Sequence, residues 1–360
     1  MTIWKNKVVK RWHMISKVRE KGELVRRFIL EHIESHNGDI AALAAEQFGI
    51  TRQAVNKHLT RLRDQGTVTK DGTGRASSYK LVQLFEQTFS YTITESLAED
   101  VVWRQDIKDT ISPLPDNVVN IWHHGFTEMF NNAIDHSGGT TIAVKITKTA
   151  ISTEVVISDD GVGIFKKIQT EFGLLDERHA IFELAKGKLT TDPRNHSGEG
   201  IFFTSRMYDK FEILSGGLYF NHERGKPEDW LLERSKAHPG TAVFMELNNH
   251  TARTTRKVFD EFTESDDYTF DKTIVPVNLA RYGADELVSR SQAKRLLARV
   301  ELFKHVIFDF KDVDSIGQAF ADQIFRVFAK EHPEIELVPL NTNAEVAKMV
   351  KRAQAAKDGE

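Results

Sequence analysis

Cysteine is absent from this chain of 360 residues, which excludes disulfides and thiolate metal sites. No apolar run approaches the ~20 residues that a membrane-spanning helix requires. The N-terminal stretch MTIWKNKVVKRWHM is basic but has no apolar core, so we do not expect a secretory signal. These absences predict a soluble cytoplasmic protein that does not bind membranes.

The sequence also lacks a metal-binding pattern, although it contains 14 histidines. There is no H-E-x-x-H motif, and no histidine pair has the spacing and nearby carboxylate of a metal site. We therefore interpret His123, His124 and His136 as local structure. The apolar content of 40% and the length are typical of a globular protein with two or three domains.

Charge is distributed unevenly along the chain. Residues 1–80 hold 16 Lys and Arg against 8 Asp and Glu, whereas the remainder holds 33 against 44. A basic front end on an acidic body indicates a polyanionic partner for the front end alone.

The basic region reads as three helices followed by a hairpin. Apolar residues recur at helical spacing over residues 23–35. A second helix should follow Asp39, and a third, capped by Thr51, should end at Gly66. Two strand-like runs flank the turn at residues 71–74. This order resembles a winged helix-turn-helix of bacterial regulators.

That resemblance implies duplex DNA as the partner of residues 1–82. The residues at the start of the third helix, where such helices meet base edges, are Arg52, Gln53, Asn56 and Lys57. Lys70 and Arg75 lie on the predicted wing, where phosphate contacts are expected. A winged helix that contacts only protein is the alternative.

The segment EMFNNAIDH, residues 128–136, ends a long helix predicted to begin at Asp116. At 3.6 residues per turn, Glu128, Asn132 and Asp135 fall on one polar stripe. Such a stripe is either a solvated face or a site for a ligand that binds oxygen atoms.

Three glycine-containing motifs follow. Asp159, Gly161 and Gly163 form D-x-G-x-G after a predicted strand, which alone would be read as a tight turn. Gly198 and Gly200 open an apolar helix, where backbone N–H groups can approach an anion. Thr241 follows a further glycine before another strand.

In this order, residues 88–250 resemble a Bergerat-fold (GHKL) ATPase, the family that includes DNA gyrase, mismatch-repair ATPases and histidine kinases. The resemblance implies ATP and Mg²⁺ as ligands. It assigns Asn132 to the Mg²⁺ ligand, Glu128 to the general base that orients water, and Asp135 to the polar residue that closes the same stripe. Asp159 would accept a hydrogen bond from the adenine amino group.

The remaining motif residues take supporting roles by the same resemblance. Gly161 and Gly163 allow close approach of the nucleotide, Gly198 and Gly200 form the phosphate-side loop, and Thr241 lies near adenine. The segment 184–200 would be the ATP lid. Its Lys186 and Lys188 could reach phosphate, but we interpret each singly as solvated charge.

Residues 270–355 alternate strands and helices, as small α/β domains do. The stretch HVIFDFKDVDSIGQAF resembles the STAS domain of anti-sigma-factor antagonists, in which a serine after an aspartate is phosphorylated. Ser315 matches that serine, although Ile316 replaces the usual second serine. A simple helix N-cap is the alternative role for Ser315.

Together these features predict a multidomain α+β and α/β protein with a winged helix, a Bergerat-fold α/β sandwich and a STAS-like domain. We expect an ATP-gated DNA-binding regulator that hydrolyses ATP slowly and dimerises with ATP, with a protein partner for its tail. The alternative is a serine protein kinase acting on a STAS domain in cis or in trans. A DNA-handling ATPase ranks last, and a standard sensor kinase is rejected because no phosphoacceptor histidine domain precedes the ATPase. The choice between regulation and defence stays open.

Overall fold

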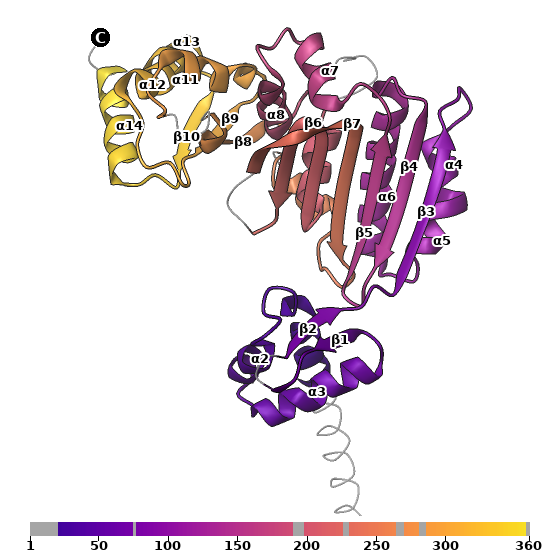
Figure 1. The fold of residues 1–360 in the computed structure, drawn as a ribbon. Helices are drawn as coiled ribbons and strands as arrows, with labels where there is room; N and C mark the ends of the chain where they lie inside the picture. Colours follow the sequence, from indigo (N-terminus) through magenta and orange to yellow (C-terminus); the bar gives the residue numbers. More distant parts are fainter. Residues whose placement is uncertain are drawn as a thin grey trace, which may run out of the picture. The chain divides into compact units, whose positions relative to one another are not determined.

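The computed structural model describes residues 21–74, 77–189, 198–225, 230–263, 270–280 and 286–357 (Figure 1). The chain forms two compact units, residues 1–87 with 146–154 and residues 88–145 with 155–360. It is a mixed α+β protein with sheets of two, three and five strands. None of the helices that the structure describes is both long and apolar enough to cross a membrane.

The first unit contains the predicted helices and hairpin. Residues 21–32 are helical, and α2 (Ile40–Phe48) and α3 (Arg52–Asp64) follow. Gly49 ends α2 at φ 59°, a left-handed conformation that glycine adopts without strain. Strands β1 (Val68–Asp71) and β2 (Ser78–Leu81) pair antiparallel.

Two capping predictions in this unit have different outcomes. Thr51 caps α3 as expected, because its Oγ1 accepts a hydrogen bond from the Ala54 N–H at 3.2 Å. Asp39 precedes α2, but its side chain makes no capping bond. It accepts from His36 Nδ1 at 3.1 Å instead, so Asp39 holds the predicted N-cap position of α2 without a side-chain bond to that helix.

A small apolar core holds the first unit together. It buries residues from all three helices, from the turn after the first helix and from β1, namely Val25, Ile29, Ile33, Ile40, Ala44, Val55, Leu59, Leu62 and Val68. The hairpin is bonded to the turn after the first helix, because the Leu81 N–H donates to Glu34 Oε1 at 2.8 Å. The polar faces of the helices are thus left on the surface.

The five-stranded sheet has the order β3-β4-β5-β7-β6. Its strands are β3 (Phe85–Thr92), β4 (Thr141–Lys148), β5 (Ser152–Asp159), β6 (Lys210–Glu223) and β7 (Trp230–Asn248). Residues alternate between buried and partly exposed along β5, as expected for a sheet covered on one face. The long helix α6 (Asp116–His136), which has the predicted bounds, lies across that face (Figure 1).

Shorter helices surround α6 and the sheet. The chain reaches α6 through α4 (Glu99–Val102), a π-helical turn (Trp103–Ile107) and α5 (Lys108–Ile111). After β5 come α7 (Ile164–Glu171) and α8 (Glu177–Lys186), which pack on each other. Helix α9 (Gly200–Met207) packs against α6, and α10 (Thr255–Asp260) contacts both.

The C-terminal part alternates strands and helices, as predicted, and its described strands form a parallel sheet in the order β10-β9-β8. The strands are β8 (Lys272–Pro276), β9 (His305–Asp309) and β10 (Glu336–Leu340). Short 3-10 helices follow β8 (Val277–Ala280) and precede β9 (Val300–Leu302). The helices are α11 (Arg290–Leu297), α12 (Gln318–Asp322), which continues as a π-helix (Gln323–Phe328) into α13 (Ala329–Glu331), and α14 (Ala344–Lys357).

Candidate functional site

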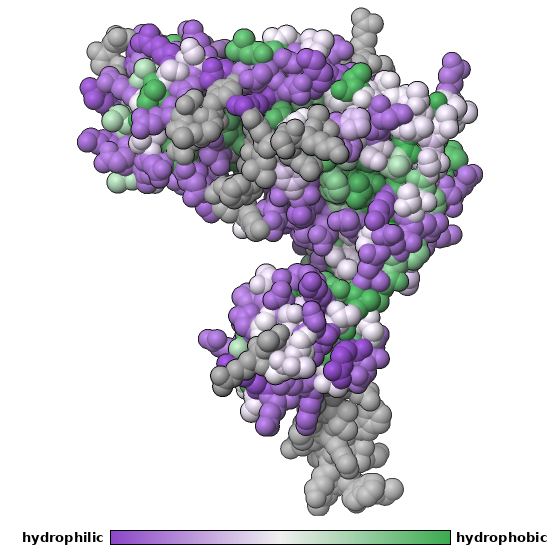
Figure 2. Space-filling view, viewed as in Figure 1, coloured by the Kyte–Doolittle hydropathy of each residue, from purple (hydrophilic) through white to green (hydrophobic). Residues whose placement is uncertain are grey.

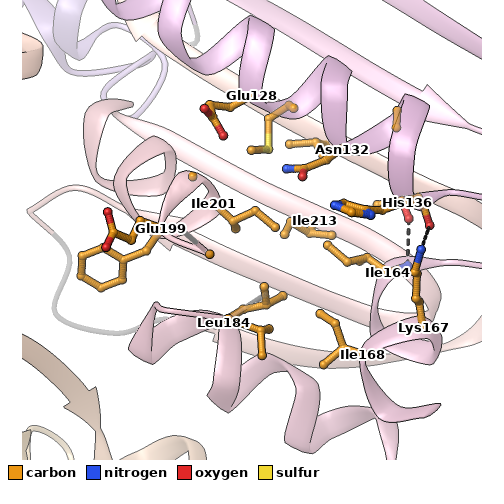
Figure 3. Close-up of a pocket in the computed structure, with 18 of the residues that line it drawn as sticks. Glu128, Asn132, His136, Ile164, Lys167, Ile168, Leu184, Glu199, Ile201 and Ile213 are labelled. Atoms are coloured by element: carbon orange, nitrogen blue, oxygen red, sulfur yellow. Dashed lines mark hydrogen bonds between the residues drawn. The ribbon is translucent and has the colours of Figure 1, made fainter. Parts of the chain in front are cut away.

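A cavity of about 420 Å³ lies between α6, α7, α9 and the sheet of the second unit (Figure 3). Six of the residues singled out from the sequence line it, although they are up to 113 positions apart: Glu128, Asn132, Asp159, Gly198, Gly200 and Thr241. The volume falls in the range of pockets that hold small molecules and cofactors. The fold therefore converts motifs scattered along the chain into one site.

On α6, the cavity-facing stripe differs in one member from the prediction. Glu128 and Asn132 face the cavity, and His136 takes the third position (Figure 3). Asp135 is exposed and does not line the cavity, so the expectation that it completes the stripe is not met. The cavity follows the residues spaced four apart on α6, which are His124, Glu128, Asn132 and His136, and Asp135 does not belong to that row.

Glu128 meets the start of α9. A Cβ atom added to Gly200 would overlap the Glu128 carboxylate, so the N-terminus of α9 and this carboxylate approach as closely as a glycine permits. The unpaired N–H groups and partial positive charge at a helix start favour an anion there. This end of the cavity is suited to an anionic group of a ligand.

The other end of the cavity is organised around Asp159. Its Oδ1 accepts hydrogen bonds from the N–H groups of Gly161 at 2.9 Å and Thr241 at 3.2 Å. Among the described residues, no donor to Oδ2 is found, which leaves that atom able to accept from a ligand. Burial raises the pKa of Asp159 above its usual value, although the two backbone donors act in the opposite direction.

The three glycines beside Asp159 are required by protein neighbours. Gly161 and Gly163 do not line the cavity. Added Cβ atoms would meet the Ser137 carbonyl oxygen at Gly161 and Ser215 Oγ at 2.6 Å at Gly163. Gly240, at φ 68°, lies against the Asp159 carbonyl. These glycines let the loops pack closely enough to hold Asp159 in place.

Two further residues line the cavity, Lys167, which the sequence interpretation missed, and His124, which it had assigned to local structure. Lys167 of α7 lines the cavity, and its Nζ donates to the His136 carbonyl at 2.8 Å (Figure 3). His124 lies one turn before Glu128 and its Nε2 is buried without a hydrogen-bond partner among the described residues. Burial, with a smaller effect of His123, lowers the pKa of His124 and so favours the neutral ring. The only sequence signal for His124 was its four-residue spacing from Glu128.

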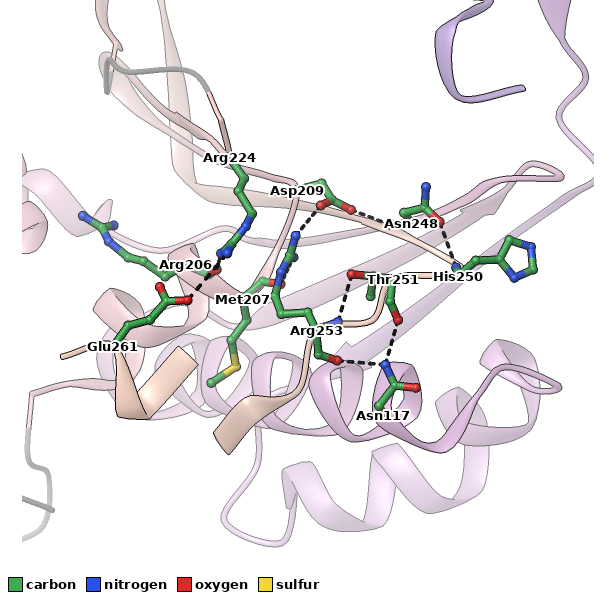
Figure 4. Close-up of polar contacts among 10 residues, drawn as sticks. All are labelled: Asn117, Arg206, Met207, Asp209, Arg224, Asn248, His250, Thr251, Arg253 and Glu261. Carbon is green, nitrogen blue, oxygen red and sulfur yellow. Dashed lines mark hydrogen bonds and ion pairs between the residues drawn. The ribbon is translucent and has the colours of Figure 1, made fainter. Parts of the chain in front are cut away.

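A polar network fixes α9 relative to α6 (Figure 4). The Arg253 guanidinium donates to the Met207 carbonyl at the end of α9 and to Asp209 Oδ1 at 2.6 Å. Asn117, near the start of α6, donates to the carbonyl oxygens of Thr251 and Arg253, both at 2.8 Å. The loop after β7 thus links the two helices that carry Gly200 and Glu128.

The two lysines of the predicted lid do not face the cavity. Lys186 is only 1% exposed, so its interpretation as solvated charge is wrong. Lys188 is partly buried, and its Nζ donates to the Leu302 carbonyl at 2.9 Å. Lys186 Nζ donates to the Ala298 carbonyl, so both lysines have a partner in the C-terminal part of the chain.

The first unit presents a separate candidate surface. The side chains of Arg52, Gln53, Asn56 and Lys57 are all exposed at the start of α3, and Lys70 is exposed on β1. Arg75 lies outside the described residues. The surface around α2 and α3 is largely hydrophilic (Figure 2). Exposed cationic and amide groups on one helix end can contact phosphates and base edges.

Comparison with known families identifies one part of the chain. Residues 292–347 match the STAS-like domain of unknown function (DUF4325), which confirms the STAS-like nature of the tail over that stretch. No curated protein matches the chain. Ser315 lies within the matched stretch, is exposed, and stands two residues before the Gly317 cap of α12. Within the described residues, no three His, Asp or Glu side chains are grouped to hold a metal ion.

Proposed function

We propose that the protein is an ATP-gated DNA-binding regulator with a Bergerat-type nucleotide site in the cavity. The observation that carries this proposal is that one cavity has a hydrogen-bond acceptor at one end and a helix N-terminus at the other. Asp159 offers a fixed carboxylate at one end, and Gly200 opens α9 against Glu128 at the other. A nucleotide has this polarity, with an amino-bearing base and an anionic phosphate chain.

Each of these groups would contact a different part of the nucleotide. Asp159 Oδ2 would accept from the adenine amino group, and the α9 N-terminus would receive phosphate. Asn132 would give one oxygen to Mg²⁺, which usually takes its other ligands from phosphates and water. Glu128 lies within the same cavity, where a carboxylate can orient a water molecule for attack on the γ-phosphate.

One titration tests the nucleotide site directly. Purified protein is titrated with ATP and Mg²⁺, and phosphate release is then followed. We expect saturable binding that requires adenine, with slow release of free phosphate. Equal affinity for ATP and GTP would contradict the role of Asp159, because the guanine base carries a carbonyl where adenine carries its amino group.

We further propose that the first unit is a winged helix-turn-helix that binds duplex DNA through α3. The support is the exposed set at the start of α3 in a segment of net positive charge. Retention on duplex DNA that weakens steeply with salt is the expected result. Absence of retention at low salt would indicate that this unit binds protein instead.

A serine protein kinase is the second candidate function. It is favoured by one observation, the exposure of Ser315 within the STAS-like stretch. In that case the Ser315 hydroxyl, or a serine of a partner, would attack the γ-phosphorus of ATP, lose its proton to Glu128 and release ADP. ATP labelled in the γ-phosphate separates the candidates, since label on protein favours the kinase and free labelled phosphate favours the regulator.

A further inference from the structure

We infer that Arg299 of the C-terminal part is a positioning residue for the cavity, and that it couples the STAS-like domain to nucleotide binding. The nucleotide as ligand rests on the function proposed above. The coupling itself rests on contacts between the last turn of α8, the segment 187–189 and residues 270–303. None of these contacts is part of the cavity described above.

A buried charge network joins α8 to the C-terminal part. Lys186, the last residue of α8, places Nζ 2.9 Å from Glu183 Oε1 and 2.5 Å from the Ala298 carbonyl oxygen. Arg299 Nε lies 3.3 Å from Glu183 Oε2. Glu183 is 3% exposed and Lys186 is 1% exposed. Separating these groups would leave charges buried without partners, which is strongly unfavourable.

The segment that follows α8 contains a strained residue, Lys188. The C-terminal part of the chain binds both its backbone carbonyl and its side chain. Lys188 has φ 54°, which residues other than glycine rarely adopt. An Arg299 Nη2 group donates to the Lys188 carbonyl at 2.6 Å, while Lys188 Nζ donates to the Leu302 carbonyl at 2.9 Å. Such a conformation persists only where the surroundings determine it.

Gly187 adds a second constraint. It has φ 85°, and an added Cβ would lie 2.6 Å from Phe270. Phe270 also packs on two cavity-lining rings of α9, with ring centroids 4.6 Å from Phe202 and 4.9 Å from Phe203. The same aromatic ring therefore contacts the end of α8 and the start of α9.

The strained segment leads directly into the cavity wall. Leu189 follows Lys188, lines the cavity, and its N–H donates to the Gly198 carbonyl at 2.9 Å. Gly198 also lines the cavity, two residues before the Gly200 start of α9. Release of Lys188 by Arg299 would allow Leu189 and Gly198 to shift together. A ligand that binds one arrangement of Leu189 and Gly198 more tightly must then also shift the contacts of Arg299. By the same coupling, a change at Arg299 must alter the affinity for that ligand.

The test uses the full chain with Arg299→Gly. Arg299 itself has φ 60°, so glycine removes the side chain without strain at that position. Lys294→Ala is the matched control, because this exposed lysine of α11 loses the same charge away from the cavity. Arg299→Lys retains the charge but lacks the guanidinium, which contacts both Glu183 and the Lys188 carbonyl. This second variant keeps the test valid if the glycine variant does not fold. Hydrogen exchange is measured over residues 182–189 and 198–207, with and without ATP.

Without ATP, we expect Arg299→Gly and, less strongly, Arg299→Lys to accelerate exchange in both segments about 5- to 100-fold, and Lys294→Ala to leave it unchanged. With ATP, the wild type should gain protection at residues 298–303, and Arg299→Gly should lose that gain. Unchanged exchange in both Arg299 variants would overturn the coupling, whether or not ATP binds. Acceleration in a protein that binds no ATP would support the coupling and reject the proposed nucleotide.

Discussion

The cavity and the surface of α3 hold their polar groups in opposite ways. Asp159 is partly buried and receives two backbone hydrogen bonds, while Glu128 is set against a helix start by a glycine. Arg52 and Asn56 are exposed on the first turns of α3. The polar groups of the cavity are held in place by the protein itself, whereas the side chains at the start of α3 are exposed. Substitutions in the two regions should therefore differ in kind as well as in size.

The largest effect should come from Glu128→Gln in the cavity. An amide cannot act as a base or hold water in the same way, so ATP turnover should fall by ~10²–10⁴-fold while ATP still binds. Turnover and equilibrium binding are measured on the same preparation. Asp135→Asn is the control, because Asp135 is exposed outside the cavity and turnover should be unchanged.

A smaller effect on binding is expected from Asp159→Asn. The asparagine oxygen can still accept from Gly161 and Thr241, but its NH₂ group would face the adenine amino donor. We expect ATP affinity to fall about 10- to 100-fold, the cost of an unmatched buried polar group. Isothermal titration measures the change, and affinity equal to the wild type would reject this assignment.

Asp159→Asn should lower the affinity for ATP but raise the stability of the folded protein. Because burial raises the pKa of Asp159, its ionised form is less stable in the folded than in the unfolded chain. This penalty is present in full at pH values above the raised pKa, shrinks as the pH falls from the raised pKa to the ordinary pKa, and is absent below the ordinary pKa. Asp159→Asn should therefore raise the Tm at neutral pH, and the difference from wild type should shrink on acidification. A lower Tm at neutral pH would contradict this sign.

On α3, the combined change Arg52→Ala and Asn56→Ala should reduce sequence preference without altering stability. Removing one side chain that reads a base edge costs about 1–3 kcal/mol of discrimination. Binding to a duplex selected from a random pool is compared with binding to an unselected duplex. Arg63→Ala, at the other end of α3, removes a similar charge and should leave the preference intact.

The smallest effect is expected from Lys70→Ala on the hairpin. If Lys70 contacts one phosphate, the slope of log affinity against log salt should fall by about 0.9, with the same loss for every duplex. Measurements at four or more salt concentrations define the slope. A change in sequence preference would instead place Lys70 at a base edge.

The sequence predicted those features that follow from local patterns. The start of α6 follows from Pro113 and Pro115, which precede it. Asp159 stands at the end of β5 and Gly200 at the start of α9, which are positions that local patterns identify. Asp135 was misplaced because a polar stripe spans a wide angle on a helix, and periodicity does not say which edge faces inward. His124 could not be separated from structural histidines by spacing alone.

Long-range contacts were beyond such reasoning. Lys186 is buried only because Ala298 and Glu183 supply partners, and Ala298 is 112 residues away. A charged residue beside glycines is usually solvated, so the local sequence favoured the wrong environment. The STAS-like tail was recognisable in advance because its strand and helix pattern is contained in one contiguous stretch.

The position of Arg299 in the chain has a consequence for synthesis. The helices of the first unit and α6 depend mainly on nearby residues, but the segment after α8 depends on Arg299 and Leu302. At ~5–20 residues per second, ribosomes add Arg299 on the order of 5–20 s after Gly200. During that interval a nascent chain holds its motif residues without the contacts that fix Lys188. Newly made protein should thus complete its cavity late, after the first unit has already folded.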